Sequence, residues 1–248
     1  MSDALSIAAS GLKSEEFLID KIANDLANLN TPNYKASKLT FEDMLYQTIN
    51  GAQFGLGTAV YKSGKDFATG PLKPSTNWND VAINGAGFYQ VVTNDGSIAY
   101  TRNSNFIVDK DHYLATQDGL RLADNIQIPE DFSKITIKNS GEVEVSLANE
   151  TEVQVLGTIQ LAKFINPEQL NPIGSGIYTS TEDSGEALID NPETNGLGAL
   201  VQNQIEASNV DMVNSLMQLT MAQRVYQLNA KAVQIADELE QLTNEIRN

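Results

Sequence analysis

The chain has 248 residues, with 32 acidic against 16 basic side chains and a formal net charge of −16. That charge repels nucleic-acid phosphates, so the sequence argues against a nucleic-acid partner. It has no cysteine, which excludes disulfides and thiolate metal sites, and no apolar run approaches the roughly 20 residues of a membrane span. The first residues lack the basic segment of a secretory signal, so we expect no membrane insertion and no cleaved signal peptide.

The first thirty residues predict a helix with one apolar seam. Its members alternate spacings of three and four, with Glu15 as the single polar misfit: Leu5, Ala8, Leu12, Glu15, Ile19, Ile22, Leu26 and Leu29. This is the spacing of a coiled-coil seam. Gly11 weakens the helix by about 1 kcal/mol relative to alanine, so it needs a partner. Residues 31–33 end it.

Residues 34–76 carry weaker signals. Phe41, Leu45 and Ile49 have the spacing of one face of a short helix. Seven glycines and prolines follow between residues 50 and 76. Such a composition predicts an extended, loose connector that a partner has to order.

From Trp78 onward the hydrophobic pattern changes to period two, which indicates strands. We predict one hairpin from residues 88–92 and 98–102, and a second from residues 106–108 and 113–115. Further strands are expected at residues 120–122, 126–128, 135–137, 143–145 and 153–164. Residues 166–200 are rich in glycine and proline and predict a loop that returns to the last helix. Short strands at near-regular spacing are typical of an antiparallel β domain.

Residues 208–248 predict one long helix. Ser208, Asn209 and Asp211 are helix-starting residues, and no glycine or proline follows them. Apolar side chains recur in two sets: Met212, Leu216, Leu219, Tyr226, Ala230 and Val233, then Leu228, Ile235, Leu239, Leu242 and Ile246. These spacings are those of a helix that docks against other helices. About forty residues reach roughly 60 Å, so we expect partners beyond its own domain.

The predicted fold class is therefore α+β. The long N- and C-terminal helices, residues 1–33 and 203–248, pair as a coiled-coil-like inner domain. Residues 34–76 form a Gly-rich connector, and residues 77–202 form a central antiparallel all-β domain. On periodicity alone, an antiparallel helical hairpin that caps a single domain explains the two seams equally well.

Candidate catalytic carboxylates occur only as adjacent pairs. A glycosidase needs two carboxylates that face each other across about 5–10 Å, whereas neighbouring residues in a strand or loop point apart. We therefore interpret three pairs as solvated turn or cap residues: Glu42 with Asp43, Glu130 with Asp131, and Glu182 with Asp183.

Other candidate sites are equally weak. Asp109 and Asp111 lack the remaining ligands of a calcium loop, so we expect a hairpin turn there. His112 is the only histidine, so no histidine cluster can form, and no nucleophile-elbow motif accompanies it. Gly85 and Gly87 have no third glycine and no following helix, which indicates close backbone approach rather than phosphate binding. We predict no enzyme activity, no cofactor and no metal.

Several collinear stretches resemble the flagellar rod and hook proteins of bacteria. Residues 23–35 (ANDLANLNTPNYK) resemble the N-terminal signature of that family, and residues 41–49 (FEDMLYQTI) resemble the stretch that follows it in the distal-rod members. Two further stretches are similar to the start of the family's β domain: residues 80–88 (DVAINGAGF) and 99–102 (AYTR). Three more resemble the C-terminal signature: residues 195–198 (NGLG), 206–211 (EASNVD) and 223–233 (QRVYQLNAKAV).

The resemblance implies a structural subunit of the distal rod of the flagellar basal body, which acts in motility. Its terminal helices would polymerise into the drive-shaft tube that transmits torque to the hook. The implied partners are other copies of the chain, other rod and hook proteins and the flagellar type III export apparatus, with the surrounding P- and L-ring proteins as further neighbours. The implied location is the periplasm-spanning rod.

Two departures from the family pattern keep alternatives open. Residues 50–57 are shorter than the insert usual in distal rod proteins, which favours a proximal rod or hook-like subunit of the same family. Residues 103–105 (NSN) replace the usual Asp/Asn-Gly turn. A periplasmic glycan hydrolase is the alternative from a different class of protein.

The seams and the resemblance together predict residues of a subunit interface. Polar groups within a helical seam cost stability unless they are paired, and they can fix the register of the partners. We expect Asn24, Asn28, Gln223, Arg224 and Asn229 to set the register between subunits, unless they are solvated residues of an exposed helix face. The full predicted set is Leu12, Ile19, Ile22, Asn24, Leu26, Asn28, Leu216, Leu219, Gln223, Arg224, Tyr226, Asn229 and Val233.

Overall fold

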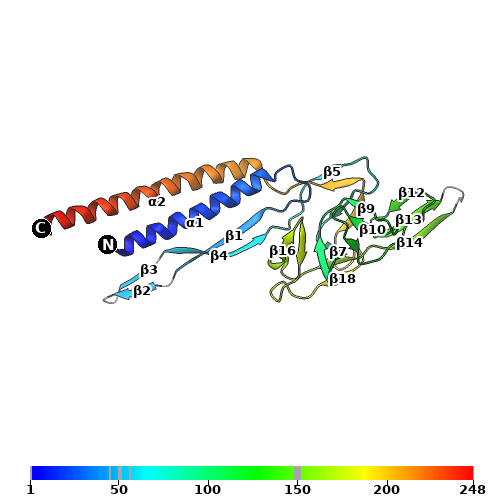
Figure 1. The fold of residues 1–248 in the computed structure, drawn as a ribbon, viewed down its shortest axis with the longest axis horizontal. Coiled ribbons are helices and arrows are strands. Elements are labelled where there is room, and N and C mark those ends of the chain that lie inside the picture. Colours follow the sequence, from blue (N-terminus) through cyan, green and yellow to red (C-terminus); the bar gives the residue numbers. More distant parts are fainter. Residues whose placement is uncertain (1, 45, 50–51, 56, 148–151, 248) are drawn as a thin grey trace. The chain divides into compact units, whose positions relative to one another are not determined.

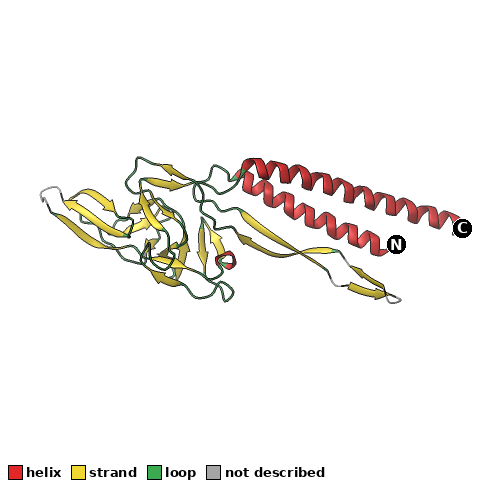
Figure 2. Ribbon diagram, turned by 180° about the vertical axis from the view of Figure 1, so that it is seen from behind, coloured by secondary structure: helices red, strands yellow, loops and turns green. Residues whose placement is uncertain are grey.

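A computed structural model describes residues 2–44, 46–49, 52–55, 57–147 and 152–247. The fold is α+β, as predicted, with one N-terminal helix, one C-terminal helix and a strand-rich remainder (Figure 2). The chain divides into two compact units. The helical unit comprises Met1–Leu29, Ser37–Gly64 and Val210–Asn248, and the β-rich unit comprises Asn30–Ala36 and Lys65–Asn209.

The N-terminal helix α1 spans Ser2–Ala27. The helix gives way to a turn in which the Asn28 amide donates to the Asn24 carbonyl at 3.2 Å and the Leu29 amide to the Leu26 carbonyl at 3.3 Å. All eight residues of the predicted seam are buried or half-buried, and Ile22 is the most deeply buried of them. The predicted seam is therefore the covered face of α1.

The C-terminal helix α2 spans Met212–Arg247, about 54 Å at 1.5 Å per residue. Asp211 caps it, because its Oδ1 accepts the Asn214 amide at 3.0 Å and its carbonyl accepts the Ser215 amide at 2.9 Å. The helix begins at Met212, after all three predicted helix-starting residues. Within the helical unit, α2 and α1 lie side by side (Figure 1).

Two short β ribbons complete the helical unit. β1 (Ser37–Asp43) pairs with β4 (Thr58–Lys65), and β2 (Tyr46–Ile49) pairs antiparallel with β3 (Ala52–Gly55). The predicted short helix over Phe41 and Ile49 is wrong, since both lie in strands; Leu45 lies outside the described residues. Thr40 and Phe41 favour strands, and the partner strand β4 satisfies the backbone of β1. The predicted division into inner domain, connector and β domain stays a prediction.

The β-rich unit contains the remaining strands and one 3-10 turn, η1 (Pro167–Gln169). The strands are β5 (Leu72–Pro74), β6 (Val81–Asn84), β7 (Phe88–Val92), β8 (Ile98–Thr101), β9 (Phe106–Val108), β10 (Leu114–Thr116), β11 (Arg121–Leu122), β12 (Phe132–Ile137), β13 (Glu142–Leu147), β14 (Val153–Thr158), β15 (Leu161–Lys163), β16 (Asn171–Gly174), β17 (Ile177–Thr179), β18 (Leu188–Asp190), β19 (Ala199–Gln202) and β20 (Gln204–Glu206). The largest sheet follows the order β16-β17-β8-β7-β11-β10-β9, and β15 joins β7 to β18. β12, β13 and β14 form a second sheet, and β19–β6 and β20–β5 are separate antiparallel pairs.

Both predicted hairpins are confirmed. β7 pairs with β8 so that Val92 faces Ile98, and β9 pairs with β10 so that Val108 faces Leu114. Gly96 has a φ of +82° in the first turn, a conformation that glycine adopts without steric cost. The predicted strand at residues 126–128 is only a single bridge between Tyr113 and Gln127. Pro129 follows directly and has no N–H with which to extend the pairing.

Two other predictions of secondary structure are wrong. The single strand expected over residues 153–164 is two strands, β14 and β15, in different sheets. They separate where the buried Ile159 donates its amide to the Gly141 carbonyl at 2.8 Å. The loop expected over residues 166–200 contains β16, β17 and β18 and the start of β19. β17, β18 and β19 pair with the earlier strands β8, β15 and β6, and β16 pairs with its neighbour β17, so local glycine and proline content conceals them.

The core of the β-rich unit lies between its sheets. A large cluster of buried side chains from β6, β7, β9 to β13, β15 and β19 includes Val81, Ile83, Tyr89, Phe106 and Leu161. A second, aromatic cluster packs edge to face around Phe88, Tyr100 and Tyr178. Their alternation along each strand is the period-two pattern of the sequence.

Candidate assembly site

The two terminal helices share an apolar seam. Ile22 on α1 and Ala222 on α2 are 1% and 3% exposed. Gly11 marks a close approach, because a Cβ added there would lie 3.1 Å from Nδ2 of Asn229. A glycine in mid-helix costs about 1 kcal/mol, and here it makes room for the facing amide.

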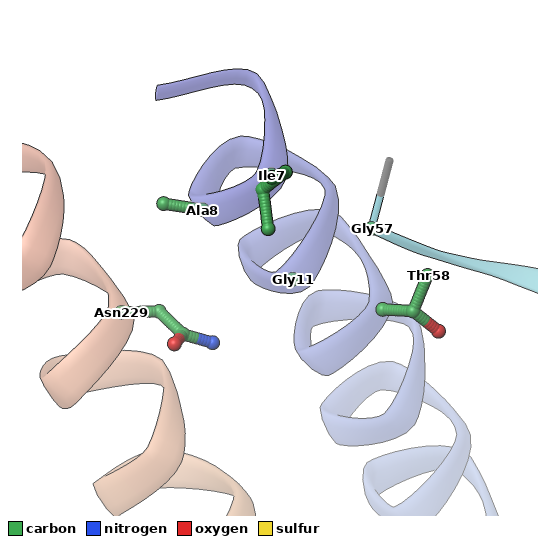
Figure 3. A pocket seen from close by; sticks show the side chains of 6 residues that line it. All are labelled: Ile7, Ala8, Gly11, Gly57, Thr58 and Asn229. Atoms are coloured by element: carbon green, nitrogen blue, oxygen red, sulfur yellow. The ribbon is translucent and has the colours of Figure 1, made fainter. Parts of the chain in front are cut away.

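Beside this approach the helical unit has a hollow of about 520 Å³. In Figure 3, Asn229 extends from α2 toward α1, and the start of β4 borders the opposite side of α1. The lining residues are Ile7, Ala8, Gly11, Gly57, Thr58 and Asn229. One amide in a mainly apolar wall suits packing against another chain's side chain better than binding of a charged ligand.

A second face of α1 is polar and binds the ribbon formed by β1 and β4. The Ser10 hydroxyl accepts the Thr58 amide at 3.2 Å, and the Ser14 hydroxyl donates to the Thr58 carbonyl at 3.4 Å. Toward the other end of the helix, Oδ1 of the buried Asp25 accepts the Ser37 amide at 2.9 Å. The sequence interpretation missed this face. Its signal is the spacing of four between the two serines, which places them on one side of the helix.

Gly57 fits the ribbon onto α1. Its φ is +109°, and a Cβ at this position would lie 2.0 Å from Oγ of Ser10. Real Cβ contacts are essentially never closer than 3.0 Å, so a side chain there would displace the Ser10 hydroxyl that accepts the Thr58 amide. The backbone conformation therefore favours glycine, and its lack of a side chain leaves the Ser10 hydroxyl free to bind the ribbon.

Glu15 is the polar misfit of the α1 seam, and it is half-buried. Its Oε2 is buried and has no hydrogen-bond partner among the described residues. Burial raises the pKa of this carboxyl. An unpaired buried oxygen weakens the helical unit.

The helix α2 also has an apolar face that no described residue covers. We call it the outer stripe: Met221, Leu228, Ile235 and Leu242, spaced by seven residues. They are 69%, 67%, 47% and 53% exposed. Four large apolar side chains on one exposed face indicate an interaction surface.

The structure divides the predicted interface residues into two groups. The covered group is buried or half-buried within the helical unit: Leu12, Ile19, Ile22, Leu26, Asn28, Leu219, Asn229 and Val233. The exposed group is Asn24, Leu216, Gln223, Arg224 and Tyr226. Asn28 and Asn24 contact each other along α1, with Nδ2 of Asn28 donating to the Asn24 carbonyl at 2.9 Å.

The two sets of apolar residues predicted for α2 do not both pack within the chain. Met212 and Leu216 are exposed, as are Leu228, Ile235, Leu239 and Leu242. The side chain of Ile246 lies outside the described residues. A helix beside one partner covers only one stripe of its surface, so the remaining apolar side chains stay in solvent.

The residues considered for chemistry serve as turn and surface groups. All six carboxylates of the three adjacent pairs are exposed. The predicted turn at Asp109 and Asp111 is confirmed, and Arg121 bonds both carboxylates. His112 Nε2 lies 3.2 Å from Glu130 Oε1 at the surface. At Gly85 an added Cβ would lie 2.7 Å from Cα of Gly198, which confirms close backbone approach.

Residues 103–105, which depart from the family pattern in sequence, contact two other segments of the β-rich unit. The Ser104 side chain is fully buried and its hydroxyl donates to Oδ1 of Asn33 at 3.1 Å. Its carbonyl accepts the Val81 amide at 2.6 Å. Across the described residues, neither a helix suited to spanning a membrane nor a cluster of potential metal ligands is found.

The chain thus combines a helical unit, in which α1 and α2 lie side by side and α2 carries an uncovered apolar stripe, with a strand-rich unit. Comparison with known proteins identifies the class to which this architecture belongs. Residues 82–145 match the family described as the flagellar hook protein FlgE/F/G D1 domain, and residues 201–246 match the C-terminal region of the flagellar basal-body rod FlgEFG proteins.

Individual relatives extend the match to the whole chain. The flagellar basal-body rod protein FlgG of Borreliella burgdorferi is 35% identical over 100% of this chain and 99% of its own length. FlgG of Caulobacter vibrioides is 35% identical over 99% of each chain. The hook protein FlgE of Salmonella typhimurium is 33% identical over 73% of this chain but only 46% of its own length. The chain belongs to the FlgG family of flagellar basal-body rod proteins and is a structural subunit of the distal rod.

Proposed function

We propose that the chain polymerises through α1 and α2 into the tube of the rod, which transmits torque to the hook. The observation that carries this proposal is the outer stripe of α2. Burying a fully exposed Leu, Ile or Met side chain contributes roughly 1.5–3 kcal/mol. The four residues of the outer stripe are about half to two-thirds exposed. Burying them against another chain would therefore stabilise the assembly by several kcal/mol.

Charge supports a second copy as the occupant. Arg224 and Lys231 lie between the apolar residues of the outer stripe, and both are exposed. On α1, Glu16 and Asp20 are exposed one helical turn apart. The basic pair of one copy therefore has acidic groups to face on α1 of a neighbour.

The two groups of predicted interface residues then have different roles. The covered group sets the coiled-coil-like pairing of α1 with α2 inside one subunit. The exposed group, with Arg224, Gln223 and Asn24 as its polar members, sets the register between neighbouring subunits. Polar residues in a seam favour the register that pairs them.

We extend the proposal to the remaining partners. The subunit contacts other rod and hook proteins, is exported by the flagellar type III apparatus, and lies in the periplasm-spanning rod near the P- and L-rings. The net charge of −16 keeps the monomer soluble before assembly and is unsuited to nucleic acid. We assign it no catalytic role, no cofactor and no membrane insertion.

The test is complementation of a strain that lacks the gene, with Leu228→Asp compared with Gln227→Asp. Both side chains are exposed, and Gln227 lies off the outer stripe, so only the first variant places a charge in it. We expect short rods without hooks for Leu228→Asp, and full rods with swimming for Gln227→Asp. Complete, hook-bearing rods built from Leu228→Asp would overturn the proposal.

A further inference from the structure

Three charged side chains are buried together in the β-rich unit. Lys35, Arg102 and Glu206 are 1%, 3% and 1% exposed. Oε1 of Glu206 lies 2.6 Å from Nζ of Lys35, and Oε2 of Glu206 lies 3.1 Å from Nε of Arg102. Burying charges is costly unless each is paired and hydrogen-bonded, so a cluster of this kind needs full satisfaction by its surroundings.

The surroundings provide it. Lys35 also donates to the Ala68 carbonyl at 2.7 Å, and Glu206 also accepts the Gly70 amide at 2.8 Å. Arg102 donates to the carbonyl of Gly87 at 3.0 Å and to that of Gly85, also at 3.0 Å. Burial and then the neighbouring Arg102 lower the pKa of Lys35, while Glu206 opposes them. The cluster thus joins the end of β8 to the segments that precede β1 and follow β4, the two strands of one ribbon.

Asn209 adds a second, uncharged set of bonds to the same segments. Its Oδ1 accepts the Ala36 amide at 2.8 Å, and its Nδ2 donates to the carbonyls of Asp66 at 2.8 Å and Ala68 at 3.1 Å. The carbonyl of Glu206 accepts the Asn33 amide at 2.8 Å. Glu206 and Asn209, which precede α2, therefore both bind segments 33–36 and 66–70.

The position of these segments in the chain gives the cluster its meaning. The chain passes between its two compact units at four places, after Leu29, Ala36, Gly64 and Asn209. On the β-rich side, every passage leads directly into segment 30–36, segment 65–70 or segment 206–209. Every covalent path between the units therefore runs through residues that Lys35, Glu206 and Asn209 tie together.

We propose that Lys35, Arg102, Glu206 and Asn209 form a clasp that makes these four passages one mechanical joint. Ion pairs and hydrogen bonds are directional, unlike apolar contacts, so a clasp built from them resists sliding of one segment past another. Gly70 lies within it with no space for a side chain, since an added Cβ would be 2.2 Å from the Ala207 carbonyl oxygen. The role of the joint in carrying torque rests on the proposed function, but its cooperativity does not.

The test is hydrogen exchange of the purified full chain, read by mass spectrometry, for Asn209→Ala. The control is Asn166→Ala, which removes one exposed amide bond, from Nδ2 of Asn166 to the Asp183 carbonyl, elsewhere in the same unit. In Asn209→Ala we expect exchange to rise at least tenfold in segments 30–36, 65–70 and 203–209 together, and less than twofold in β7. Asn166→Ala should leave all three segments unchanged.

Two results would overturn the clasp. One is a rise confined to the amide of Ala36, the direct partner of Asn209, because the segments would then be independent. The other is an equal rise of hydrogen exchange in β7, or a loss of Trp78 fluorescence showing that the whole unit has unfolded. In either case no separable joint would exist. The measurement uses the monomer, so failure of the clasp is distinct from failure of rod assembly, which the outer-stripe variants report.

Discussion

Tyr89→Phe tests how the core of the β-rich unit holds its largest buried polar side chain. Tyr89 lies on β7 with no exposed surface, and its hydroxyl donates to the Val81 carbonyl at 2.7 Å. The ring packs edge to face on Phe106, with 4.9 Å between centroids, and phenylalanine keeps that contact. Burial raises the pKa of Tyr89, so the hydroxyl stays a protonated donor across the working pH range.

Removing the hydroxyl leaves the Val81 carbonyl with one partner fewer in an apolar core. Losing a partner of a buried polar group costs about 1–3 kcal/mol, so we expect the free energy of unfolding to fall by about 1–2 kcal/mol. For a domain of roughly 150 residues this corresponds to a Tm lower by about 3–6 °C. Trp78, the only tryptophan, packs against the same core and near Phe132, so its fluorescence in urea reports the unfolding of this unit.

The matched control is Tyr178→Phe. Tyr178 is also buried, which raises its pKa to about 12, but its hydroxyl makes no hydrogen bond within the described part of the chain. We expect its free energy of unfolding to change by less than about 0.5 kcal/mol. Equal effects of the two substitutions would refute the reasoning, since removal of a hydroxyl as such, and not loss of the bond to Val81, would then set the cost.

Two further predictions concern single contacts. Gly57→Ala should release the β1–β4 ribbon from α1, because residue 57 has a φ of +109° and its Cβ would overlap Ser10. The Thr58 amide should then exchange with solvent at least tenfold faster. Unchanged protection of this amide would contradict the prediction. Burial raises the pKa of Asp124 to about 6, so the folded chain takes up this proton more readily than the unfolded chain. The protonated Asp124 carboxyl contributes fully to stability below pH 4, and this contribution is lost as pH rises through 6. We expect the free energy of unfolding to fall by about 1–2 kcal/mol across that range, because the carboxyl is partly exposed. Asp124→Asn should abolish that difference in urea titrations at pH 4 and pH 7, and an unchanged pH dependence would count against it.

Much of the helical unit was predictable because its information is local. The spacing of three and four in the first thirty residues identified every covered residue of the α1 seam. Asp211, chosen as a helix-starting residue, caps α2. The hairpins of the β-rich unit were equally predictable, since the turn residues lie between strands that are neighbours in sequence.

The strands of residues 166–200 were hidden for the opposite reason. β17 is a strand because Ile177 and Tyr178 pair with Thr101 and Tyr100 on β8, more than seventy residues away. Periodicity in a short, glycine-rich segment does not report such a partner. The same limit applied to residues 37–43, whose strand β1 depends on β4.

What the sequence determined by itself is therefore the helical seams, the hairpins and the family, because each depends on residues that lie close together in the chain or on a pattern read along it. Only the tertiary structure decided which stripe of α2 is covered and which is left for another subunit. It also brought Glu206 to Lys35 across 171 residues of sequence, where three charges share one buried site. Pairing of charges from distant parts of the chain is a property of the folded chain, and no spacing along the sequence encodes it.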